Sequence, residues 1–224
     1  MLLVKDNKSL SKLLEKMVED IPLNCRDNYY RNIDTLELIE TNEKYMKNTR
    51  QRVYAYYDIF KNIIFINSRS MKEYNVDIQS DFFLYILEHE LRHAFGTQKK
   101  ANIVYSGFRK IYLNKEEESK NFCPFVLDEG FVDLMCIPIS HKYFKYRDLH
   151  HSLTAQLSLS VGLNTMKEAF YNNLGIEKLK EGLILQGHTP NKVDNFFDRY
   201  LNIDTNMNCS HAYTSLDSVE KTLL

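Results

Sequence analysis

Apolar residues recur at helical spacing in several stretches of the chain. Between about residues 80 and 95, apolar side chains share one helical face, and His89 and His93 continue that face. Polar N-cap candidates precede this run at 77–81, and Gly96 follows it. The pattern predicts a helix over about 80–95 that presents two histidines on its inward face.

Further stretches carry the same periodicity. Residues 8–20 place leucines and a methionine at helical spacing ahead of Pro22, which predicts a helix there. Similar patterns predict helices near 152–171 and near 176–186, the latter beginning after Gly175.

Strand patterns come before the histidine-bearing helix. Residues 35–40 predict one strand, and the segment 51–67 predicts two, at about 52–58 and 62–67, joined by a turn near Phe60-Lys61-Asn62. A small N-terminal sheet, then this helix, then a mainly helical C-terminal part predict an α+β fold.

Two stretches give weaker patterns. Residues 97–123 are polar and charged, which favours a loop or a short helix on a solvated face. Residues 189–224 carry no pattern that assigns an element. A loop is predicted after Pro138, and it contains His141, His150 and His151.

Length and composition predict one domain. The chain has 224 residues, of which 44% are hydrophobic, enough for a substantial core. We predict a single domain over 1–224, with an N-terminal sub-lobe of about 1–96 and a C-terminal sub-lobe of about 97–224. The net charge is −1 without a sustained basic run, so neither nucleic acid nor a membrane is an expected partner.

The chain start and the cysteines favour a cytoplasmic protein. The first residues show no signal-peptide pattern, although a leader removed earlier would leave the same pattern, and no stretch is long enough to span a bilayer. Four cysteines without a C-x-x-C spacing fit reduced thiols better than a disulfide framework: Cys25, Cys123, Cys136 and Cys209.

The string His89-Glu90-Leu91-Arg92-His93 carries the chemistry. On a helix, residues at i and i+4 lie on one face, so His89 and His93 can present two imidazole nitrogens to one zinc ion. Glu90 can then hold a metal-bound water, as in zinc-dependent peptidases. The alternative is a chance pair of histidines on a helix that binds nothing.

A third ligand is needed to complete such a site. The metzincin extension places a histidine where this chain has Lys99, which has no lone pair to offer. Farther along, Glu129 is followed after four residues by Asp133, and the two share one helical face. With the H-E-x-x-H string, this E-x-x-x-D spacing resembles that of the gluzincins, and the element order resembles that of the minimal gluzincins.

The resemblance implies a zincin-like fold and one Zn²⁺ per chain. Glu129 would be the third ligand, and Asp133 would accept a hydrogen bond from His89. Each acid also has an alternative role without a metal. Glu129 could be a solvated acid near a helix start, and Asp133 could be a surface acid. The edge strand, best matched by 52–58, would pair with a peptide substrate. The G-x-M-E-N string of gluzincin aminopeptidases is missing here, which favours an endopeptidase.

The expected reaction is peptide-bond hydrolysis by a zinc-activated water, with Glu90 as the general base. Two alternatives stay open: a non-catalytic zinc-stabilised binding or structural protein, and a zinc hydrolase of a non-peptide substrate. The oligomeric state is not predicted. A donor to the developing oxyanion is expected among residues that otherwise have structural roles: Tyr105, His188, His211 and Tyr213.

Overall fold

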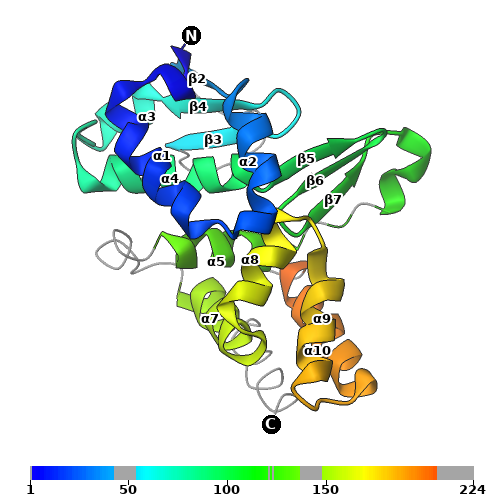
Figure 1. Ribbon diagram of the computed structural model, residues 1–224. Coiled ribbons are helices and arrows are strands. Elements are labelled where there is room, and N and C mark those ends of the chain that lie inside the picture. The colour runs from blue at the N-terminus through cyan, green and yellow to red at the C-terminus, as the bar shows by residue number, and fades with distance from the viewer. Residues whose placement is uncertain (1, 43–53, 121, 123, 137–147, 206–224) are drawn as a thin grey trace.

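The computed structural model describes residues 2–42, 54–120, 122, 124–136 and 148–205 (Figure 1). The fold is α+β, as predicted, with two small sheets and a helical C-terminal part. Short 3-10 turns cover Val4–Asp6, Lys8–Leu10 and Leu23–Cys25.

The first sheet is mixed and has four strands in the order β1-β2-β4-β3. These are β1 (Leu2–Leu3), β2 (Glu37–Thr41), β3 (Ala55–Asp58) and β4 (Ile63–Asn67). β2 and β4 are parallel, whereas β1 and β3 run antiparallel to their neighbours. The three strands predicted from the sequence are therefore confirmed, although residues 52 and 53 of the second lie outside the described residues.

Four helices accompany this sheet. The predicted helices near 8–20 and 80–95 are confirmed as α1 (Ser11–Asp20) and α4 (Asp81–Phe95), while the sequence analysis missed α2 (Arg26–Ile33) and α3 (Ser68–Glu73). The side chain of Ser80 caps α4 by accepting a hydrogen bond from the amide of Phe83. β3 lies against α4, so the sheet covers one side of the histidine-bearing helix.

The prediction of a loop or a short helix for 97–123 was wrong for residues 97–112 and correct for the short helical turn at Lys115–Lys120. The segment forms an antiparallel sheet of β5 (Thr97–Lys100), β6 (Ile103–Ser106) and β7 (Arg109–Tyr112), followed by the 3-10 turn η4 (Lys115–Lys120). Each strand has only four residues, and in β5 the two consecutive exposed lysines, Lys99 and Lys100, break the alternation on which a strand prediction depends. In Figure 1 this sheet projects sideways from the end of α4.

The C-terminal part is helical. It comprises α5 (Phe125–Met135), α7 (Asp148–Val161), α8 (Leu163–Tyr171), α9 (Gly175–Leu185) and α10 (Pro190–Thr205). The predicted helix near 176–186 is confirmed, and α10 gives an element to part of the unassigned tail. None of the helices in the described ranges is both long and apolar enough to cross a bilayer.

Two other predictions need correction. The single helix expected near 152–171 is interrupted at Gly162, whose φ of +87° ends α7 and lets α8 start in a new direction. His150 and His151 belong to α7 and not to a loop, while His141 lies outside the described residues.

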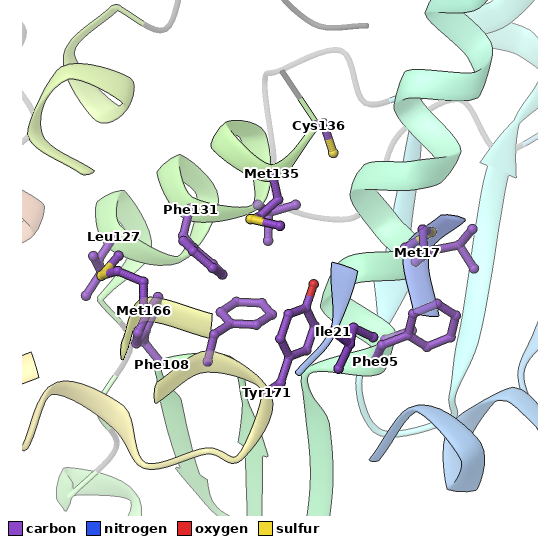
Figure 2. Packing of buried hydrophobic residues seen from close by; sticks show 14 of the residues in the cluster. Met17, Ile21, Phe95, Phe108, Leu127, Phe131, Met135, Cys136, Met166 and Tyr171 are labelled. Atoms are coloured by element: carbon purple, nitrogen blue, oxygen red, sulfur yellow. The ribbon is translucent and has the colours of Figure 1, made fainter. Parts of the chain in front are cut away.

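One cluster of buried side chains joins these layers, from Val4 in the first 3-10 turn to Tyr200 in α10. Figure 2 shows Tyr171 of α8 between side chains of α5, such as Phe131, and side chains from the N-terminal part, such as Phe95 of α4. Cys25 and Cys136 are buried free thiols, as expected, whereas Cys123 and Cys209 lie outside the described residues.

An ion pair is buried within this core. Arg92 and Glu88, the i,i+4 pair of α4, are both fully buried, and the Arg92 Nε lies 3.1 Å from the Glu88 carboxylate. The same guanidinium donates to Asp20 of α1 at 3.0 Å and to the hydroxyl of Tyr171 at 3.1 Å. Arg92 therefore ties the histidine-bearing helix to α1 and α8.

We expect Arg92→Met to lower the free energy of unfolding by about 3–5 kcal/mol, because it leaves Glu88 as a buried charge without its cation. Urea denaturation measures this loss. The matched control is Arg69→Met, which breaks an exposed i,i+4 pair with Glu73 and should change stability by no more than about 0.5 kcal/mol. Equal effects of the two substitutions would contradict the expectation.

Candidate metal centre

Three side chains from two helices meet at one point. His89 and His93 come from α4 and Glu129 comes from α5, and their ligand atoms all lie within 4.8 Å of one another. The two Nε2 atoms are 3.2 Å apart. Glu129 Oε2 lies 3.1 Å from His89 Nε2, and Glu129 Oε1 lies 3.4 Å from His93 Nε2. The three residues predicted as ligands therefore form a group that could hold a metal ion.

A carboxylate lies behind the first histidine. Asp133, one helical turn after Glu129, is fully buried, and its Oδ1 lies 2.8 Å from His89 Nδ1. The hydroxyl of Tyr85 donates to the same oxygen at 2.6 Å. The contact predicted between Asp133 and His89 is thus present, and Asp133 is not a surface acid. Tyr85, one turn before His89, was not anticipated.

A second carboxylate lies behind the other histidine. Asp128 is fully buried, and its Oδ2 lies 3.4 Å from His93 Nδ1. Its Oδ1 accepts a hydrogen bond from the backbone amide of Phe108 at 3.0 Å. Asp128 was not predicted as part of the site. Its position directly before Glu129 was nevertheless a signal, because residues next to a buried ligand on a helix are often buried as well.

A cation also reaches this cluster. Arg109 of β7 places Nη2 2.6 Å from Glu129 Oε1 and Nε 2.7 Å from Asp128 Oδ2. The first contact is a hydrogen bond, whereas the second is an ion pair without hydrogen-bond alignment. Arg109 was missed because residues 97–123 were predicted to be a solvated loop or short helix.

The positions of the carboxylates determine which ring nitrogen carries the proton. An ionised carboxylate only accepts hydrogen bonds, so the contact with Asp133 favours a proton on His89 Nδ1, and Asp128 has the same effect on His93. In the neutral tautomers both Nε2 lone pairs then face each other and Glu129. Three lone-pair donors converge, which suits a cation between them.

The electrostatics of the group follow from these contacts. Burial by itself lowers the pKa of His89, but its contacts with Asp133 and Glu129 outweigh burial and raise that pKa to about 10. The pKa of His93 is raised in the same way, by Glu129 and Asp128. Burial raises the pKa of Glu129, but His93 and His89 outweigh it and hold that pKa well below its ordinary value. The site therefore favours positive charge beside Glu129.

The remaining residues predicted for the site are Glu90 and the four candidate oxyanion donors. Glu90 follows His89 on α4 and is half-buried. Tyr105 lies next to Ser106, whose opposite residue in β7 is Arg109. Because neighbouring strand residues point to opposite faces, Tyr105 points away from the face from which Arg109 contacts Glu129. His188 lies in the turn between α9 and α10. His211 and Tyr213 lie outside the described residues.

Comparison of the chain with protein-family models, with curated proteins and with solved structures gave no match. The interpretation of the centre therefore rests on its own geometry.

The pKa shifts predict a pH-dependent stability for protein stripped of metal by a chelator. The raised pKa of His89 contributes stability fully below its ordinary value of 6.5, and this contribution is lost as the pH rises toward about 10. The depressed pKa of Glu129 contributes stability above 4.5 that is lost as the pH falls. The contribution is therefore largest between about pH 4.5 and 6.5.

Urea denaturation of stripped protein at pH 6.5, 8 and 9.5 tests this expectation. The free energy of unfolding should fall across the series, and His89→Gln should make the fall less steep because it removes one of the two imidazoles whose pKa is raised. A fall of equal steepness in the variant would assign the pH dependence to other groups.

Proposed function

We propose that this protein is a zinc-dependent metallopeptidase, and an endopeptidase in particular. The observation that carries the proposal is the convergence of His89, His93 and Glu129, with Asp133 behind His89 and Glu90 beside it. A ligand set of two histidines and one glutamate, which leaves a fourth position for water, is that of catalytic zinc in several peptidases.

The spacing of the ligand atoms fits zinc. Zinc holds nitrogen and oxygen ligands at about 2.0–2.2 Å in a tetrahedron, which places neighbouring ligand atoms about 3.3–3.6 Å apart. The two Nε2 atoms are 3.2 Å apart, and each has one oxygen of Glu129 near it, Oε2 at 3.1 Å from His89 and Oε1 at 3.4 Å from His93, which is close to these values. The same spacing would admit other small divalent ions, and the preference for zinc rests on the donor types.

The second ring nitrogen of each histidine also has the kind of partner that a metal ligand needs. A histidine that ligates a metal usually gives its other ring N–H to a carboxylate, which fixes the tautomer and raises the basicity of the ligating nitrogen. Asp133 and Asp128 are placed to do this for His89 and His93 respectively. A chance pair of histidines on a helix would have no need of buried acids behind both rings.

Different residues of the site would have different roles in hydrolysis. When bound, zinc would lower the pKa of a coordinated water and polarise the scissile carbonyl. Glu90 would accept the proton of the attacking water and deliver it to the leaving amine, since it is half-buried next to the first ligand. Asp133 and Asp128 would keep the imidazoles oriented throughout.

The first sheet supports a peptide substrate. β3 is one of the two edge strands of that sheet among the described residues, and it lies against α4, the helix that carries two of the ligands. An extended peptide can add to such an edge through main-chain hydrogen bonds while side-chain pockets select its sequence. A closed pocket around the metal would instead favour a small non-peptide substrate.

We also propose that the fold is zincin-like and of the gluzincin type. The order of a small sheet, a helix with H-E-x-x-H and a helix with E-x-x-x-D supports this proposal. Residues 55–185 carry this order, from the edge strand β3 to the end of α9.

We expect about one zinc per chain after reconstitution, and much less after Glu129→Gln. The substitution removes the ligand charge while nearly keeping its shape, so elemental analysis reports on ligation and not on folding. Glu177→Gln is the matched control, because Glu177 is exposed on α9. Full zinc content in Glu129→Gln with intact cleavage would place the third ligand elsewhere.

We expect Glu90→Gln to keep the zinc and lose most of the turnover, by about 10²–10⁴-fold, the usual range for a general base. Cleavage of a peptide library with and without a chelator provides the assay and the cleavage sites. Glu116→Gln makes the same chemical change at an exposed position in η4 and should leave the rate unchanged. A zinc-loaded wild-type protein that cleaves nothing would favour the non-catalytic alternative.

A further inference from the structure

The turn between β6 and β7 lies directly against the helix that carries Glu129. Ser106 and Arg109 are opposite each other in the register, so the turn consists of Gly107 and Phe108. Gly107 has a φ of +59°, and a Cβ on it would lie 2.4 Å from Asp128 Oδ1 and 2.3 Å from the ring of Phe170. Only glycine allows the turn to come this close to α5.

Two successive residues at this turn contact two successive residues of α5. The backbone amide of Phe108 donates to Asp128 Oδ1 at 3.0 Å, and Arg109 Nη2 donates to Glu129 Oε1 at 2.6 Å. The guanidinium Nε also forms the 2.7 Å ion pair with Asp128 Oδ2. A planar guanidinium that contacts two carboxylates restrains their rotation more than a single point charge would.

A cation beside a metal ligand needs a reason, because it repels the metal ion. The geometry of Glu129 offers one. Its Oε1 accepts the hydrogen bond from Arg109 and lies 3.4 Å from His93 Nε2, whereas its Oε2 lies 3.1 Å from His89 Nε2. Both oxygens of the carboxylate thus face a ligand nitrogen, and the guanidinium is hydrogen-bonded to Oε1.

We propose that Arg109 is a positioning residue that holds Glu129 so that only Oε2 serves as a metal ligand. This inference deepens the proposed function and rests on it. One-oxygen ligation keeps the protein ligands at three, and the positions for water and for the substrate carbonyl stay open. Without Arg109 the carboxylate can turn and bind through both oxygens, which fills a position that the reaction needs.

Cobalt substitution tests the inference without relying on activity. Visible absorption bands of Co²⁺ weaken as its coordination number rises, so the spectrum reports whether Glu129 binds through one oxygen or two. We would load wild-type protein, Arg109→Met and Arg109→Lys with Co²⁺, record the spectra, and measure dissociation constants by competition with a chelator. Thermal unfolding checks that each variant is folded.

Lys110→Met is the matched control. Lys110 is the next residue of β7, and it points to the opposite face, where its ammonium lies 6.0 Å from the ring centroid of Tyr105. The substitution removes the same charge from the same strand without touching Glu129, so its spectrum and dissociation constant should match those of the wild type.

We expect Arg109→Met to weaken the visible bands and to raise the dissociation constant by about 10–100-fold, the usual effect of losing a partner that orients a ligand. Arg109→Lys should show the same weakening, because it keeps the charge but loses the planar pair of donors. If Arg109→Met does not fold, the spectrum of Arg109→Lys still tests the inference.

Three results would overturn the inference. Unchanged spectra in both Arg109 variants would mean that Arg109 does not position Glu129, and the proposed function would stand. A wild-type spectrum in Arg109→Lys with a change only in Arg109→Met would show that charge alone matters. A wild-type protein that binds no Co²⁺ would overturn the proposed function together with this inference.

Discussion

The arrangement of the centre depends on two buried carboxylates that lie behind two imidazoles. Asp133 and Asp128 occupy the Nδ1 sides of His89 and His93, so the Nε2 lone pairs point toward each other and toward Glu129. Such a convergence is unfavourable without a positive charge between the lone pairs. A buried acid costs free energy unless it is paired, and each acid has a further partner besides its imidazole. Tyr85 donates to Asp133, while Phe108 and Arg109 contact Asp128.

These side chains come from α4 and α5, so their contacts require the two helices to pack in one fixed orientation. The core supplies this through the Tyr171 side chain, which lies between the two parts of the protein (Figure 2), and through the buried Arg92, which joins α4 to α1 and α8. The C-terminal end of α4 is restrained as well, because the side-chain amide of Asn32 donates to the carbonyl oxygens of Ala94 and Thr97. Rigidity around the ligands therefore comes from polar contacts as much as from apolar packing.

The second sheet has a different part in the same arrangement. Its tight turn brings a backbone amide and a guanidinium to Asp128 and Glu129. A glycine with positive φ makes this approach possible, since any side chain at Gly107 would collide with α5. The contacts of this turn therefore join the second sheet to the helix that carries Glu129.

The sequence by itself determined what depends on spacing within one helix. His89 and His93 share a face, as do Glu129 and Asp133, because four residues make about one helical turn. Three of the four strands of the first sheet, β2, β3 and β4, were also predictable, whereas β1 was not. Only the tertiary structure decided that Asp128, Arg109 and Tyr85 belong to the centre and that the Glu88–Arg92 pair is buried. The contacts of Asp128, Arg109 and Tyr85 join residues far apart in the chain. The burial of a polar residue is likewise not visible in the sequence, because it depends on how the elements pack.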